Sequence, residues 1–154
     1  MRDAAYLETL LPRLRGSGYV ITSDQADRPN CIGWVLYSDL YFDPVAVGGW
    51  LAGYYWPPGI RDDYNVETLL ELFALFAFEE CDNSDLEDGV EKIAIYTGAD
   101  GEASHVARQL PSGEWTSKLN KLEDIRHRTL DEILSPPEYA AVATFVRRQR
   151  KDGP

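Results

Sequence analysis

The chain has 154 residues, of which 44% are hydrophobic and 12% aromatic, the composition of one packed domain and not of a disordered segment. Its net charge of −11 argues against nucleic acid as a partner, because phosphate contacts need clustered Lys and Arg. With no apolar run long enough for a bilayer and no leader-like start, we expect one cytoplasmic domain over residues 1–154 that binds no membrane.

The N-terminal part reads as a helix, a short strand and a second helix. Apolar residues at helical spacing over Tyr6–Leu14 predict the first helix, and residues 19–22 predict the strand. A polar loop then leads to the nearly all-apolar segment Cys31–Tyr37. Asn30 is a favourable N-cap residue, so we expect Cys31 at the first position of a buried helix.

The middle of the chain alternates between irregular and regular patterns. Residues 38–64 are rich in Gly, Pro and aromatic side chains and predict a long covering loop. Asn65 precedes a strongly apolar segment that predicts a central helix from Val66 to about Glu80. The alternating segment Glu91–Tyr96 predicts a strand that ends in a turn.

The C-terminal part predicts a hairpin and a last helix. Residues 104–110 and 114–119 flank Ser112 and Gly113, a turn pair, and Ser135 with two prolines precedes apolar residues at helical spacing. The predicted fold class is therefore α+β, with N-terminal helices packed on a small antiparallel sheet and a C-terminal helix.

The two cysteines are Cys31 and Cys81, and we expect two free thiols in a reducing compartment. Neither has the spacing of a zinc site, so we predict no metal and no cofactor. A cysteine at a helix N-terminus has a reason to react, because unpaired N–H groups and the helix dipole favour its thiolate. Cys81 lies at the far end of its predicted helix and is interpreted as structural.

His105, at the start of a predicted strand, is the candidate partner of Cys31, since a histidine from elsewhere in the fold can hold an ion pair with the thiolate and act as general acid. The alternative is that Cys31 is a small buried hydrophobic residue. The other histidine, His127, is most simply a surface or capping residue.

These residues resemble the papain-like cysteine hydrolases, in which a cysteine begins a buried helix and a histidine begins a strand of the following sheet. Gln25, six residues before Cys31, has the spacing of the papain-like oxyanion glutamine. The chain also resembles, over roughly residues 30–127, an uncharacterised bacterial domain family. That resemblance rests on the stretches Asn30–Trp34, Glu91–Tyr96, His105–Leu110 and Trp115–Leu119.

The third member of a papain-like site depends on the register of the hairpin. With a two-residue turn, His105 pairs with Asn120, which would orient the imidazole, and Lys118 is the diagonal alternative. A one-residue slip favours Ser117 and Leu119 instead. An exposed hairpin tip without function is the other interpretation.

Aromatic side chains are candidates for a substrate cleft beside Cys31, or equally for a hydrophobic cover over the core. The candidates are Trp34, Trp56 and Trp115, with Trp50, Tyr54 and Tyr55 from the Gly- and Pro-rich loop.

Two functions follow from the sequence. The first is a papain-like hydrolase or acyltransferase, in which Cys31 attacks an amide or acyl bond of a small molecule or peptide and His105 protonates the leaving group. The second is a non-catalytic acidic module of antitoxin or immunity type that retains the fold and binds a basic protein, because the net charge of −11 suits such a partner.

Overall fold

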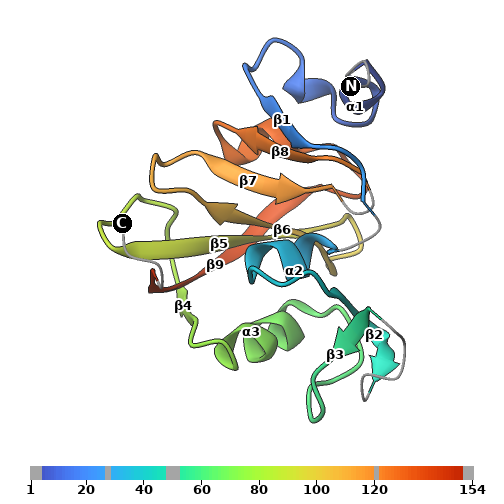
Figure 1. The fold of residues 1–154 in the computed structure, drawn as a ribbon, viewed down its shortest axis with the longest axis vertical. Helices are drawn as coiled ribbons and strands as arrows, with labels where there is room; N and C mark the ends of the chain where they lie inside the picture. The colour runs from blue at the N-terminus through green and yellow to red at the C-terminus, as the bar shows by residue number, and fades with distance from the viewer. Residues whose placement is uncertain (1–4, 27–28, 48–52, 120–121, 151–154) are drawn as a thin grey trace.

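The computed structural model describes residues 5–26, 29–47, 53–119 and 122–150. Its centre is a seven-stranded antiparallel sheet in the order β1-β8-β7-β6-β5-β9-β4, and a separate parallel pair joins β2 to β3 (Figure 1). The strands are β1 (Val20–Ser23), β2 (Tyr41–Val47), β3 (Tyr54–Trp56), β4 (Glu79–Cys81), β5 (Val90–Thr97), β6 (Ala103–Gln109), β7 (Trp115–Lys118), β8 (Asp124–His127) and β9 (Ala141–Gln149).

The helices of the described residues are short. They are α1 (Ala5–Leu10), α2 (Cys31–Val35) and α3 (Val66–Ala74), with the 3-10 turns η1 (Pro12–Leu14) and η2 (Leu130–Ile133). Within the described ranges, no helix has the length and apolar character needed to cross a bilayer.

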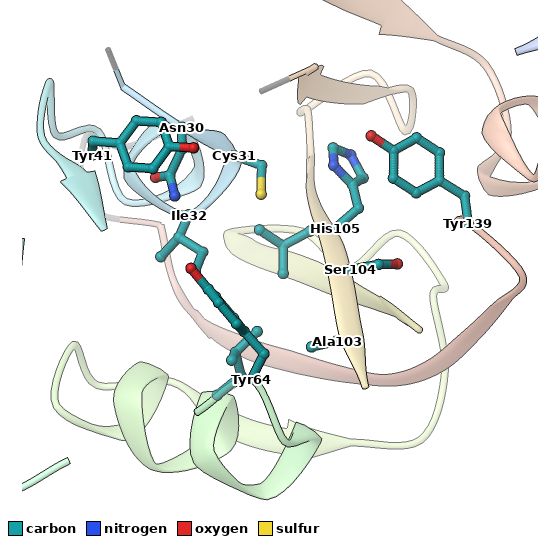
Figure 2. Close-up of a pocket in the computed structure, with 11 residues that line it drawn as sticks. Asn30, Cys31, Ile32, Tyr41, Tyr64, Ala103, Ser104, His105 and Tyr139 are labelled. Carbon is teal, nitrogen blue, oxygen red and sulfur yellow. The ribbon is translucent and has the colours of Figure 1, made fainter. Parts of the chain in front are cut away.

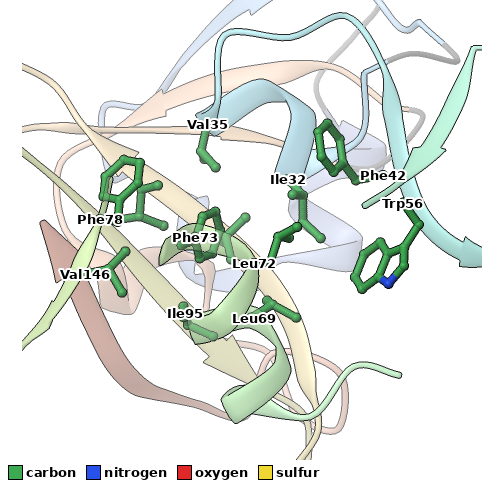
Figure 3. Close-up of a cluster of buried hydrophobic side chains, with 12 residues drawn as sticks. Ile32, Val35, Phe42, Trp56, Leu69, Leu72, Phe73, Phe78, Ile95 and Val146 are labelled. Carbon is green, nitrogen blue, oxygen red and sulfur yellow. The ribbon is translucent and has the colours of Figure 1, made fainter. Parts of the chain in front are cut away.

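The sheet has a hydrophobic core on each face, because side chains alternate along its central strands. In β5, Ile93 and Ile95 join the cluster that contains residues of α2 and α3 (Figure 3), whereas Ala94 and Tyr96 join the cluster that contains residues of α1. All four are fully buried. A strand buried on both faces reads as a nearly continuous apolar run, and Ile93–Tyr96 has that pattern.

The expected α+β, papain-like class is wrong, because the molecule is β-rich. A large antiparallel sheet dominates it, and the three short helices lie against that sheet instead of forming a helical half (Figure 1). The reason lies in segments whose sequence pattern predicts a helix or a loop and that form strands in the structure.

The expected C-terminal helix is also wrong, because its residues form β9. Val142, Thr144 and Val146 recur every second residue, and β-branched side chains at that spacing suit a strand. β9 lies inside the sheet and pairs with β5 from Val90↔Gln149 to Thr97↔Ala141. The helical spacing of Tyr139, Val142 and Val146 was coincidental.

Residues 38–64 are more regular than the expected loop, since they contain β2 and β3. Tyr41 pairs with Tyr54 and Phe42 with Tyr55, and their rings also contact across the pair. Aromatic side chains favour strands because they pack against side chains on the neighbouring strand.

The β6–β7 hairpin is present, with a register one residue away from the main expectation. Arg108 lies opposite Thr116 and Gln109 opposite Trp115. Pro111 occupies the second position of a turn that Gly113 N–H closes onto the Leu110 carbonyl oxygen, and Gly113 adopts φ 93°. A proline turn followed by a left-handed glycine lengthens the loop, which shifts the register.

Candidate functional site

A pocket of about 250 Å³ lies where α2 meets the first half of β6. Among the described residues, β6 pairs with β7 only through Arg108 and Gln109, so the first half of β6 has an edge that β7 leaves open. Cys31, His105 and Tyr139 all border the pocket, as Figure 2 shows. The complete lining is Asn30, Cys31, Ile32, Tyr41, Tyr64, Leu69, Ala103, Ser104, His105, Val106 and Tyr139.

Asn30 fixes the start of α2 beside β2. Its Oδ1 accepts hydrogen bonds from the N–H groups of Gly33 at 3.1 Å and Phe42 at 3.0 Å, and its Nδ2 donates to the Phe42 carbonyl oxygen at 2.7 Å. This confirms Asn30 as the N-cap and Cys31 as the first helical residue. A Cβ on Gly33 would lie 2.2 Å from the Leu40 carbonyl oxygen, so only glycine permits this close approach.

Cys31 is a thiol at neutral pH and not the expected thiolate. Burial raises the pKa of Cys31 from 9.0 to about 11. Hydrogen bonds from the backbone of Val106, Ile32 and Cys31 itself, and the charge of Lys118, oppose the rise only in part. Desolvation therefore outweighs the favourable end of a five-residue helix.

His105 belongs to a buried chain of hydrogen bonds that the sequence did not reveal. Its Nε2 lies 2.9 Å from Ser117 Oγ, and Ser117 Oγ lies 2.8 Å from His127 Nε2. His127 Nδ1 in turn lies 2.9 Å from the Thr129 carbonyl oxygen. All three side chains are buried, so His127 is not the surface residue that we expected.

This chain of hydrogen bonds fixes the tautomers of the His105 and His127 rings. A carbonyl oxygen only accepts, so His127 Nδ1 must carry its proton and leave Nε2 as an acceptor for the Ser117 hydroxyl. Ser117 Oγ then accepts from His105 Nε2–H, because its single proton is already used. Nδ1 of His105 is therefore unprotonated and able to take a proton.

Both imidazoles are neutral at pH 7. Burial lowers the pKa of His105 from 6.5 to about 3, and His127 contributes further to that shift. Burial lowers the pKa of His127 as well, against the opposing effect of its bond to Thr129.

Cys31 and His105 share the pocket but approach it from opposite sides of β6. Cys31 packs against the core that contains Ile32, whereas the His105 ring contacts Tyr96 and Tyr139, with ring centroids 5.4 and 5.2 Å away. Within the described ranges, no hydrogen bond joins Cys31 Sγ to the imidazole. The pair is thus neutral and separate in the unliganded protein, unlike a papain-like ion pair.

Tyrosines, and not the expected tryptophans, supply the aromatic wall of the pocket. Burial raises the pKa of Tyr41, Tyr64 and Tyr139, so all three hydroxyls stay protonated and can donate hydrogen bonds at neutral pH. Each tyrosine lies close enough to Cys31 that a thiolate there would raise the pKa of the tyrosine further.

The three candidate cleft tryptophans lie outside this lining. Trp56 is fully buried in the core and donates from Nε1 to the Arg61 carbonyl oxygen at 3.0 Å. Trp115 is buried in the opposite core, and Trp34 Nε1 donates to Thr116 Oγ1 at 3.0 Å. Of the loop aromatics, Tyr54 and Tyr55 belong to β3, and Trp50 lies outside the described residues.

The other predicted site residues are dispersed. Gln25 is exposed and does not line the pocket. Lys118 is buried, its Nζ donates to the carbonyl oxygens of Ala26 at 2.9 Å and Leu122 at 2.6 Å, and its charge lowers the pKa of Cys31. Asn120 lies outside the described residues.

Ser117, and not Asn120, is the hydrogen-bond partner of His105, because the hairpin has the register slipped by one residue. Pro111 before Ser112–Gly113 indicates the longer turn that produces this register. His127 and Tyr139 had no comparable signal, because both reach the site from distant segments.

Among the described residues, no group of three or more His, Cys, Asp or Glu side chains is arranged to hold a metal ion. Residues 20–147 match a family model described as a domain of unknown function, DUF7689. No curated protein and no solved structure matches the chain.

Proposed function

The chain belongs to this family of unknown function, and we propose that its tyrosine-lined pocket binds a small neutral acyl compound that acylates Cys31, with His105 as the base. The observation that carries the proposal is that a cysteine and an oriented, unprotonated imidazole line one pocket. This chemistry does not require the papain-like fold, because nucleophile–base pairs recur on unrelated folds.

The reaction begins from the neutral pair. Substrate fills the pocket, and the thiol proton passes through a water molecule to His105 Nδ1 in the same step in which Sγ attacks, so that no ion pair has to form beforehand. Sγ attacks the carbonyl carbon, and the bond to the leaving group breaks as that group takes the proton back from Nδ1. Water or another nucleophile then releases the acyl group from Sγ by the same steps.

Two features support this assignment of roles. Ser117 and His127 hold His105 with Nδ1 free, and the Ser117 oxygen can stabilise the imidazolium that forms. Backbone N–H groups of Ile32 and Val106 lie beside Sγ, where an oxyanion would develop, and so replace the glutamine expected at residue 25.

The test is acylation by p-nitrophenyl acetate, followed by mass spectrometry of the intact protein. We expect an acetyl group on Cys31 that Cys31→Ala abolishes and the matched variant Cys81→Ala retains, since both thiols are free and only Cys31 lines the pocket. His105→Gln should slow acylation about 100-fold, the usual effect of losing a general base. Equal acylation of the two cysteine variants would contradict the proposal.

A second candidate, an acidic module that binds a basic protein, is favoured by the segment Glu79–Asp88. It carries six acidic residues, mostly exposed, and includes β4, the edge strand of the sheet. Binding of a lysine-rich peptide that weakens with salt, and that the double variant Asp82→Lys, Asp85→Lys removes, would support this function. Cys31→Ala should leave such binding unchanged.

A further inference from the structure

We infer that the acyl compound carries a linear apolar chain, and that this chain lies in a leucine-lined groove on the far side of Tyr139. The inference rests on the proposed function and names its substrate class. The leucine groove has a volume of about 450 Å³ and is formed by Leu7, Thr9, Leu10, Leu11, Leu119 and Leu122 with residues 135–139.

Tyr139 connects the groove to the candidate site. It lines both the pocket and the groove. On the pocket side its ring lies 5.2 Å from the ring of His105, and Figure 2 shows the two rings side by side. A substrate whose carbonyl group lies between Cys31 and His105 therefore has the apolar groove on the other side of a single aromatic side chain.

The groove lies on the His105 side of the sheet. Leu7, Leu11 and Leu119 belong to the core that also receives Tyr139. The same core includes Ala107, two residues from His105 and hence on the same face of β6. An acyl chain bound to Cys31 would thus pass the open edge of β6 once, beside His105, and then continue along that face of the sheet.

The lining selects against charged groups. Neither the pocket nor the groove is lined by Lys or Arg among the described residues, and Glu138 contributes one carboxylate. An anionic substrate would meet this carboxylate and a chain of net charge −11. Leu10, although 55% exposed, turns apolar surface toward the groove, which suits a hydrocarbon chain.

The first experiment compares p-nitrophenyl acetate with p-nitrophenyl hexanoate. Burial of one methylene group increases affinity up to about fourfold, so the four additional methylene groups of hexanoate should raise the efficiency of Cys31 acylation by up to about 250-fold over acetate. Leu10→Asp should remove most of this advantage. Leu75→Asp is the matched control, because Leu75 is 59% exposed and lies outside the groove.

The second experiment measures binding without chemistry. Hexanamide titrated into Cys31→Ala should perturb the NMR signals of Leu10 and Leu122, and Leu10→Asp should weaken its binding about tenfold. An unchanged Kd in Leu10→Asp, or equal acylation by both esters, would overturn the groove assignment even if Cys31 is acylated. Hexanamide binding without acylation by either ester would support the groove and overturn the cysteine chemistry.

Discussion

Ser117 connects two buried imidazoles with one hydroxyl group. It accepts from His105 and donates to His127, and no side chain that only donates or only accepts could do both. The sequence predicted Ser117 as an alternative partner of His105, because the register of a hairpin follows from its turn. The contact between Ser117 and His127 could not be predicted, because it depends on how β7 and β8 pair.

We predict that Ser117→Ala lowers the free energy of unfolding by about 2–3 kcal/mol, because it leaves a buried donor on His105 and a buried acceptor on His127 without partners. Urea denaturation followed by circular dichroism measures the loss. Ser112→Ala, at the exposed hairpin turn, is the matched control and should change stability by less than about 0.5 kcal/mol. Similar losses in both variants would mean that the buried chain contributes no stability.

The second residue-scale prediction concerns pH. The folded-state pKa of His105 lies near 3 and the unfolded value near 6.5, so the unfolded chain binds more protons between these values. The stability that His105 contributes is thus complete above pH 6.5 and is lost as pH falls, by up to about 1 kcal/mol per pH unit. His127 acts in the same direction.

Urea midpoints between about pH 7 and pH 5, above the main titration of carboxylates, test this prediction. His105→Gln removes the titrating group, so its stability should depend less steeply on pH than that of the native chain. If the two slopes agree, protonation of His105 does not limit stability in acid.

At the scale of elements, local signals that fix a backbone conformation were reliable, whereas hydrophobic spacing located β5 and the start of α3 correctly but predicted a helix where β9 lies. Asn30 marked the start of α2, and Ser112–Gly113 marked a hairpin. By contrast, the helix expected to reach Glu80 ends at Ala74, and Ala77 adopts φ 70°, a left-handed conformation that leads into β4. Tertiary pairing decided β4 and β9, and no local pattern reports which strands pair.

The third prediction tests how α2 is placed. Gly33→Ala should improve the intrinsic helix propensity of α2 but lower the free energy of unfolding by about 3 kcal/mol or more, since the added Cβ would lie 2.2 Å from the Leu40 carbonyl oxygen. Gly101→Ala is the control, because its added Cβ would have no neighbour within 4 Å. Its cost arises only from the left-handed backbone at residue 101, where φ is 84°. It should cost about 1 kcal/mol.

Alkylation gives a second measurement on these glycine variants. Displacement of α2 in Gly33→Ala should expose Cys31 and speed its reaction with iodoacetamide. Gly101→Ala should leave that rate unchanged. A stable Gly33→Ala protein with an unchanged rate would contradict the close packing of α2 on β2.

At the scale of the molecule, one sheet separates two cores, and its central strands contribute side chains to both. β5 sends alternate side chains into each core, so neither core can form without the central strands. Ion pairs link these strands as well: buried Glu91 of β5 binds Arg148 of β9 at 2.6 Å. The sequence predicted a single packed domain, but the division into two cores follows from the seven-stranded sheet.

The fourth prediction is that Phe73→Ala, in the α3 core, lowers the free energy of unfolding by about 3–5 kcal/mol, because Phe73 is fully buried and packs on Phe78. Leu75→Ala, one residue beyond α3 and 59% exposed, should cost less than about 0.5 kcal/mol. Circular dichroism and tryptophan fluorescence should give coincident transitions in both variants. Separate transitions would show that the two cores unfold independently.

The position of β9 has a consequence for synthesis in the cell. β9 lies between β5 and β4, and Tyr139 of the pocket lies two residues before it, so neither Tyr139 nor β9 is in place until residues 139–149 have left the ribosome. Until then the backbone of β5 has an open edge, and the apolar side chains meant to cover it have no partner. We therefore expect nascent chains to depend on chaperones until residues 139–149 have emerged from the ribosome.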